Sequence, residues 1–212
     1  MDCKIRSAAA AAVAACVAAS ALGGDSTTHY VPCGNSEHET VGSFYATVTY
    51  SHTGGSNASV SILMENTTAA GLGGYITGLA LNGGAGVTGM SFTSCTMASF
   101  AGLAGPVSAP PFGSFVTGAS IGHSWLGGGD PSAGIGVGGS ATFVFGMSGS
   151  AAALSALTAE DVFGTDGPFM AVRFRGGSPD DWSDKVLGCP TPAPGALSLL
   201  AFCGLVASRR RR

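Results

Sequence analysis

The chain has 212 residues, of which 35 are glycine and 10 are proline, while 45% are apolar and only 10% are charged. So much apolar sequence disfavours outright disorder, and the lack of a G-X-Y period excludes collagen. Residues 7–172 contain no Lys or Arg, and residues 24–190 carry three basic and eleven acidic side chains, a formal charge of −8. Phosphate neutralisation needs clustered cations, so a nucleic-acid-binding surface is excluded as well.

The first 23 residues have the three-part pattern of a secretory signal peptide. Lys4 and Arg6 precede an apolar run over 7–22, which ends near the small-residue sequence Ala19-Ser20-Ala21. This order of basic, apolar and small residues predicts export and removal of the segment. An alternative is that the Val-Ala-Ala-Cys sequence ending at Cys16 resembles a bacterial lipobox, which would make that cysteine a lipid-modified N-terminus.

Residues 24–188 have the pattern of short strands joined by glycine-rich turns. Apolar and polar residues alternate over 44–50 and 60–64, and period two is typical of a half-buried strand. Further candidate strands are 74–81, 89–93, 112–121, 135–145 and 169–175. About seven to nine such strands with Gly, Pro and Ser between them predict an all-β fold, an antiparallel β-sandwich.

Two local features stand out within this strand pattern. Ala151 to Ala156 favours a short helix, and Thr158 to Asp161 resembles a capping box with Asp in the usual place of Glu. In the last strand, Arg173 and Arg175 alternate with apolar residues and are expected to point away from the core.

Glycine-rich motifs in the chain do not support catalysis. The sequence around Ser120, Gly118 to Gly122, matches the G-x-S-x-G nucleophile elbow, but no helix is expected after it. Two G-x-G-x-x-G sequences, at 84–89 and 134–139, likewise lack a following helix in a βαβ unit. Abundant glycine makes such matches common by chance. We therefore expect no catalytic residue, no cofactor and no enzyme, and a secreted hydrolase is the least favoured class.

Potential metal ligands occur in two places, although we expect no bound metal. Asp180, Asp181 and Asp184 offer oxygen ligands of the kind that Ca²⁺ takes, without EF-hand spacing. A solvated acidic loop is the expectation, and a Ca²⁺ site is the alternative. Near the start of the central region are further candidate ligands: His29, Glu37, His38 and Glu39. That stretch is expected to be a mobile leader before the first strand.

Three cysteines remain outside the two terminal segments: Cys33, Cys95 and Cys189. In an oxidising compartment one pair is expected to form a disulfide. We predict the pair Cys33–Cys189, because both cysteines flank the central region and the ends of a domain usually lie close together. Pairing of Cys33 with Cys95 is the alternative.

The C-terminal segment, 189–212, has three parts of its own. A proline-rich stretch up to Gly195 precedes an uncharged, mainly apolar run over 196–207, and the chain ends in four arginines. At 1.5 Å per residue the apolar run spans about 20 Å, short of the ~30 Å hydrocarbon core. It is a marginal anchor whose arginines would stay on the cytoplasmic side, as is typical of a sorting signal that is later removed.

This layout resembles the C-terminal sorting tail of PEP-CTERM proteins, over about 22 of the 212 residues. The resemblance implies processing by exosortase, a bacterial envelope with an outer membrane, and an exopolysaccharide or cell-surface destination. Ala193 stands where the family has Glu. The residues that carry the resemblance to the sorting motif are Pro192, Ala193, Pro194, Gly195, Arg209, Arg210, Arg211 and Arg212.

The sequence thus predicts a signal peptide at 1–23, a Gly-rich acidic β-sandwich at 24–188 and a sorting tail at 189–212. The leading hypothesis is a non-enzymatic exported protein of the cell surface or extracellular matrix, whose precursor is held at the inner membrane by its tail. A carbohydrate-binding module is the alternative, because sandwiches often bind sugars on aromatic side chains. Candidate platforms are Tyr45, Tyr50, Tyr75, Trp125 and Trp182.

Overall fold

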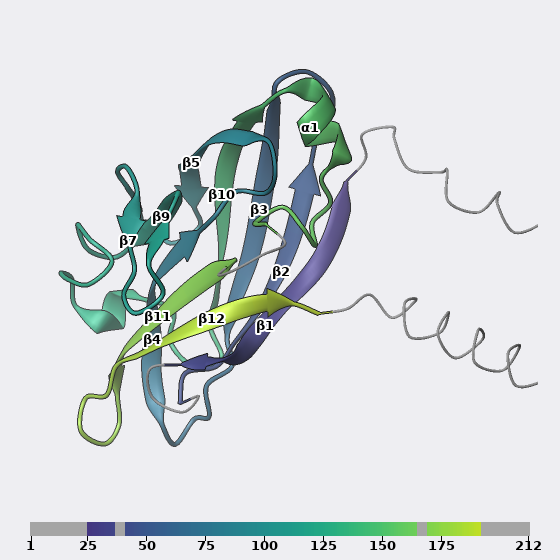
Figure 1. The fold of residues 1–212 in the computed structure, drawn as a ribbon. Coiled ribbons are helices and arrows are strands. Elements are labelled where there is room, and N and C mark those ends of the chain that lie inside the picture. Colours follow the sequence, from purple (N-terminus) through teal and green to yellow (C-terminus); the bar gives the residue numbers. More distant parts are fainter. Residues whose placement is uncertain (1–24, 37–40, 165–168, 192–212) are drawn as a thin grey trace, which may run out of the picture.

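The computed structural model describes residues 25–36, 41–164 and 169–191, which form an antiparallel β fold (Figure 1). The strands are β1 (Ser26–Ser36), β2 (Phe44–Ser51), β3 (Asn57–Asn66), β4 (Gly73–Leu81), β5 (Val87–Cys95), β6 (Ala101–Leu103), β7 (Val107–Ser108), β8 (Ser114–Phe115), β9 (Thr117–Ser120), β10 (Ser140–Gly149), β11 (Met170–Gly177) and β12 (Asp184–Pro190). A 3₁₀ turn spans Pro131–Ala133, and the helix α1 spans Ala151–Ala156. The predicted all-β class is confirmed.

Ten of these strands form one continuous sheet in the order β5-β10-β3-β2-β1-β12-β11-β4-β9-β6. The sheet curls until its edge strands β5 and β6 approach each other, so it is nearly closed into a barrel (Figure 1). The predicted antiparallel β-sandwich would consist of two separate sheets packed face to face, whereas here one continuous sheet contains ten of the strands. The strand β1 explains the difference, because Ser26–Tyr30 pair with β2 while the segment from Tyr30 to Ser36 pairs with β12. The long strand β1 therefore joins the two halves of the sheet, β5-β10-β3-β2 on one side and β12-β11-β4-β9-β6 on the other.

The core fills the inside of this curled sheet. In β2 the buried residues Phe44, Ala46, Val48 and Tyr50 alternate with partly exposed ones, as the period-two pattern predicts. The predicted strand at 60–64 is likewise confirmed within β3. Two other predicted strands differ at their ends: 112–121 divides into β8 and β9, and 135–139 forms a turn before β10.

One end of the barrel is covered by the segment 150–164. Here α1 forms as predicted, with the Ser150 hydroxyl accepting a hydrogen bond from the Ala153 N–H. Two core tyrosines reach this segment: Tyr50 donates to Leu154 O at 2.6 Å, and Tyr30 donates to Glu160 O at 2.8 Å. The expected capping box instead closes a turn, in which the Asp161 carboxylate accepts from the Thr158 N–H without a helix following.

A second apolar layer covers part of the sheet's outer face. Ala80, Ala171 and Leu187 lie in register across β4, β11 and β12 and point away from the barrel core. Val107 and Phe115, from the separate two-stranded sheet of β7 and β8, pack on them. The small side chains of Ala80 and Ala171 thus make room for Val107 and Phe115, and Figure 1 shows β7 beside β9.

The predicted signal segment and the sorting residues from Pro192 to Arg212 lie outside the described residues. The predicted start of the tail at 189 falls inside β12, since Cys189 and Pro190 pair with β1. Within the described ranges, the structure contains no helix long and apolar enough to cross a membrane.

Candidate functional site

A pocket of about 300 Å³ opens on the outer face of the sheet, between β7 and the loop that follows β9. Its walls come from the end of β6, the start of the β7–β8 hairpin and the residues after Gly122. The lining side chains are Leu103, Ala104, Pro106, Val107, Ser108, His123, Ser124, Trp125 and Leu126. The surface is therefore mainly apolar, with two hydroxyls and one imidazole.

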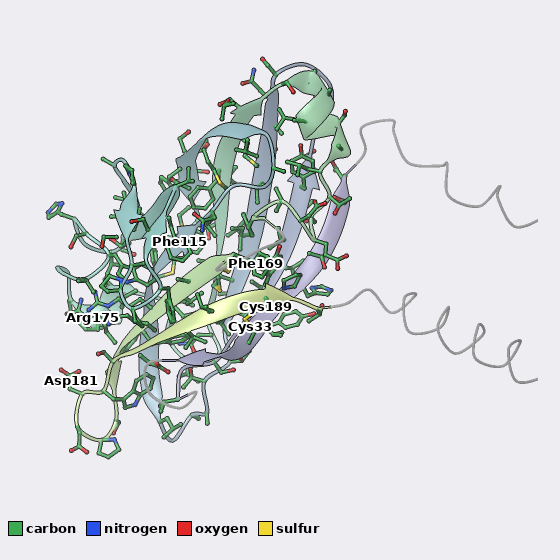
Figure 2. The ribbon with its side chains drawn as sticks, viewed as in Figure 1. Cys33, Phe115, Phe169, Arg175, Asp181 and Cys189 are labelled. Atoms are coloured by element: carbon green, nitrogen blue, oxygen red, sulfur yellow. A yellow bond between two sulfur atoms is a disulfide. The ribbon has the colours of Figure 1, made fainter. Side chains whose placement is uncertain are left out.

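Two arginines hold the loop in place. Arg173, on the outer face of β11, donates from Nη1 to the Trp125 carbonyl, and Arg175 donates to Gly128 O at 2.9 Å and to Gly129 O at 3.3 Å (Figure 2 labels Arg175). The predicted outward orientation of both is confirmed. Gly128 and Gly129 have φ of 88° and 74°, a region that favours glycine. The loop's shape thus depends on its glycines and on two cations beneath it.

Asp130 marks the end of this loop and begins the 3₁₀ turn. Its carboxylate accepts a hydrogen bond from the Ser132 N–H at 3.0 Å. This bond, with a further contribution from the charge of Arg175, holds the pKa of Asp130 below its usual value. The carboxylate is therefore a local cap that fixes where the loop rejoins the body of the protein.

Ser120, the serine of the G-x-S-x-G match, is buried at the end of β9. Its hydroxyl donates to Gly122 O at 2.7 Å and accepts from the Gly122 N–H at 3.2 Å. A Cβ on Gly122 would lie 2.2 Å from the Gly127 carbonyl oxygen. The motif is therefore a tight turn that starts the pocket loop, with its hydroxyl satisfied by backbone groups.

The two other glycine motifs also lead into strands. Gly84 donates its N–H to Val162 O at 2.7 Å, and residues 84–89 continue into β5. Residues 134–139 turn into β10. Since neither motif precedes a helix, neither has the geometry that cradles a phosphate at a helix N-terminus.

Trp125 lines the pocket, and it is a buried residue of the pocket loop that exposes only 3% of its surface. Its ring lies over Gly78 of β4, where a Cβ would stand 3.7 Å from Cε3. The indole Nε1 is buried and has no hydrogen-bond acceptor in the part of the chain that the structure describes. Most buried indole N–H groups have a partner.

The other candidate aromatic platforms serve mainly the fold. Tyr50 is buried, and Trp182 packs on Gly177 while its Nε1 donates to Leu72 O at 2.9 Å. Tyr75 lies between Gly136 and Gly176, where a Cβ on either would approach its ring to 3.4 Å. Tyr45 lies on the outer face of β2, where it stacks on His29 with centroids 5.0 Å apart.

The acidic loop between β11 and β12 does not gather its three carboxylates. Asp184 is buried and accepts from the Gly42 N–H at 3.0 Å and the Lys185 N–H at 2.7 Å. Asp180 and Asp181 are exposed in the turn, as Figure 2 shows for Asp181. Among the residues described, no three His, Cys, Asp or Glu side chains are placed to hold a metal ion.

His29 lies in β1 and not in a mobile leader. Its Nδ1 lies 3.2 Å from Thr47 Oγ1, and its ring stacks on Tyr45. The other proposed ligands of that group, 37–39, lie outside the described residues. The leader prediction was wrong because β1 is formed by pairing with strands far away in the sequence, which no local pattern reveals.

Cys33 and Cys189 form a disulfide that links β1 to β12, with Cα atoms 5.5 Å apart (Figure 2). This is the pair favoured from the sequence. The third cysteine, Cys95, is a free thiol at the end of β5. Partial burial raises the pKa of this thiol, which makes it less reactive.

Sequence reasoning missed the pocket because its walls come from loops that belong to no periodic element. One signal was present: Trp125 and Leu126 are two large apolar residues directly before Gly127, Gly128 and Gly129.

Comparison of the chain with protein-family models, curated proteins and solved structures found no match.

Proposed function

We propose that this chain is an exported, non-enzymatic protein of a bacterial envelope, displayed at the cell surface or in the extracellular matrix. The observation that carries the proposal is the Cys33–Cys189 disulfide. Disulfides persist in oxidising compartments outside the cytoplasm, so this bond agrees with the signal-peptide pattern of residues 1–23.

The position of the disulfide also suits a domain attached through its C-terminal end. The bond joins β12, which leads toward the predicted sorting tail, to β1, which follows the predicted cleavage site. The Thr191 N–H donates to His29 O at 2.7 Å, and both ends of the described fold lie on one side of it (Figure 1). Removal of the tail beyond Thr191 would therefore leave this fold intact.

The tail would act as in the PEP-CTERM proteins that it resembles. We propose that it retains the precursor at the inner membrane until an exosortase cuts near Pro192–Gly195 and releases the domain to the surface. The four terminal arginines would resist translocation, because cationic residues stay on the cytoplasmic side.

Processing can be tested with the full chain carrying an epitope tag between Asp25 and Ser26, expressed with and without an exosortase. We expect a product shortened at its C-terminal end and found outside the inner membrane only when the enzyme is present. Replacing the four arginines with glutamine should abolish this processing, whereas Ala193→Glu, which restores the family's residue, should speed it. An intact protein in the cytoplasm, or processing that ignores the arginines, would overturn the proposal.

A carbohydrate-binding role is a second candidate, favoured by one observation. The stacked pair of Tyr45 and His29 lies on an outer sheet face whose neighbouring residues include Thr47, Thr49 and Ser61. An aromatic ring among hydroxyl groups suits a neutral sugar. Retention of the protein on a neutral polysaccharide, lost in Tyr45→Ala and kept in Tyr75→Phe, would support this role, while no retention of the wild type would remove it.

A further inference from the structure

We propose that the pocket beside β7 binds a small, uncharged, mainly apolar molecule that offers one hydrogen-bond acceptor to Trp125. The volume of about 300 Å³ lies at the lower end of the range for small-molecule sites. Liquid water occupies ~30 Å³ per molecule, so the space suits a ligand with on the order of ten non-hydrogen atoms. This binding is independent of the route by which the protein reaches its destination.

The walls of the pocket define the apolar part of the ligand. Leu103, Pro106, Val107 and Leu126 all line it. Leu126 exposes 49% of its surface, the highest value among the exposed large hydrophobic side chains of the described residues. A ligand that covers Leu126 would remove this apolar area from water, which is favourable in proportion to the area buried.

The charges around the pocket define what the ligand lacks. No Asp, Glu, Lys or Arg is among the lining residues, and His123 is the one titratable side chain in them. The two nearest arginines of β11 are directed to the loop carbonyls of Trp125, Gly128 and Gly129. A charged ligand would lose its hydration without gaining a partner of opposite charge, so a neutral one is favoured.

Trp125 supplies the polar contact. Its backbone carbonyl is bonded to Arg173, so the residue is held firmly, yet its indole N–H is buried without an acceptor in the described structure. Trp125 lines the pocket, so a ligand that reaches its indole and brings the missing acceptor gains this hydrogen bond. A carbonyl or ether oxygen on the ligand meets this requirement.

The indole nitrogen is shielded from water, so the acceptor reaches it only if the hairpin moves outward. β7 and β8 form a separate two-stranded sheet with only the pairs Val107–Phe115 and Ser108–Ser114. Such a small hairpin resists displacement less than a strand of the ten-stranded sheet does, because fewer backbone bonds hold it. Ligand binding should therefore change the surroundings of the Trp125 ring.

Two neutral probes of nearly equal shape isolate the hydrogen bond. Acetophenone has a carbonyl oxygen where α-methylstyrene has a CH₂ group, so the first can accept from an indole N–H and the second cannot. The full chain, labelled with ¹⁵N and kept soluble in a maltoside detergent, is titrated with each, and the indole N–H signals are followed by NMR. Trp125→Phe assigns the signal of Trp125 by removing it.

We expect acetophenone to shift the Trp125 signal saturably and to bind about threefold to tenfold more tightly than α-methylstyrene. In Trp125→Phe this preference should disappear. Ala104→Phe, at an exposed wall position, should fill the pocket and abolish binding of both probes, whereas Ala101→Phe, exposed on β6 outside the pocket, should bind normally.

Three results would overturn the proposal. These are no saturable shift of the Trp125 signal with acetophenone, equal affinity for the two probes, or unchanged binding in Ala104→Phe. Each variant is first checked for the wild-type pattern of backbone amide signals and for the Cys33–Cys189 disulfide, which exclude loss of the fold as the cause.

Discussion

Gly122 illustrates how a residue pattern that is typical of catalysis can be a consequence of packing. The residue follows Ser120 in the turn that opens the pocket loop, and its Cα faces the carbonyl groups of Gly127 and Gly128. Any side chain there would collide with backbone, which cannot rotate away. The glycines around Ser120 are therefore required by the close approach of two chain segments and not by a reacting serine.

This gives a prediction at the scale of one residue. Gly122→Ala should destabilise the fold by about 1–3 kcal/mol, because its Cβ would lie 2.2 Å from the Gly127 oxygen and force the loop to move. Gly127→Ala is the matched control in the same loop, since its Cβ would meet Ser124 Oγ at an ordinary 3.5 Å. Urea denaturation of both variants measures the difference, and equal stabilities would contradict this explanation of the motif.

At the scale of elements, the segment 150–164 depends on two buried phenols. Tyr30 and Tyr50 donate to carbonyls of this segment, and Phe163 packs against the Tyr30 ring with centroids 5.4 Å apart. Burial, with the charge of Asp161 adding to it, raises the pKa of both tyrosines. The neutral phenol is therefore the form that the folded protein favours.

The raised pKa values of Tyr30 and Tyr50 make the free energy of unfolding depend on pH. A raised pKa in the folded state means that these groups stabilise the fold fully below the unfolded value of about 10, and that the stabilisation is lost as the pH rises toward the folded pKa. We expect the free energy of unfolding to fall above about pH 10. Tyr50→Phe should make this fall shallower, and a fall of the same slope as in the wild type would contradict the role of Tyr50.

At neutral pH the same variant should lose about 1 kcal/mol, because the Leu154 carbonyl loses its hydrogen bond to the phenol. Hydrogen exchange of the amides in α1 should speed up accordingly. Tyr45→Phe, on the outer face of β2, is the matched control and should leave α1 unchanged.

Local elements of this fold could be predicted from the sequence, and elements formed by distant pairing could not. The alternation over 44–50 and the alanine-rich stretch 151–156 carry their own signals, so β2 and α1 were predicted correctly. β4 was also predicted, as the strand 74–81, but the unbroken burial of residues 76–81, which means that both faces of β4 are covered, was not. The outer face of β4 is covered by Val107, Phe115 and Trp125. These residues lie in segments without a periodic pattern, so the sequence does not predict that they pack there.

For the candidate site, too, local features could be predicted from the sequence, and contacts between distant segments could not. That Arg173 and Arg175 point outward follows from period two within β11, and this was predicted. That they bind loop carbonyls some 45–50 residues earlier depends on the strand order of the sheet, which the sequence does not display. That Trp125 Nε1 is buried without an acceptor in the described structure could not be predicted either, because it results from the packing of several side chains around one ring.

At the scale of the whole molecule, one covalent bond connects the two central strands of the sheet. The strands β1 and β12 are neighbours in the middle of the ten-stranded order, and the Cys33–Cys189 disulfide spans 156 residues of sequence. Any pull on the C-terminal segment would first reach β12. If the precursor is attached to the membrane through its tail, as proposed above, the disulfide would hold the strand that carries the load.

Removing this bond should have the largest effect on stability of the changes considered. For a loop of this length, the chain-entropy model assigns the disulfide about 5 kcal/mol. The double variant Cys33→Ala/Cys189→Ala should lower the urea midpoint by a corresponding amount, and dithiothreitol should lower the wild-type midpoint to the same value. Cys95→Ala, which removes the free thiol on β5, should leave the effect of dithiothreitol intact. If reduction did not change the midpoint, the bond would not be what holds β12 to β1, and the backbone pairing of the two strands alone would have to carry any load from the tail.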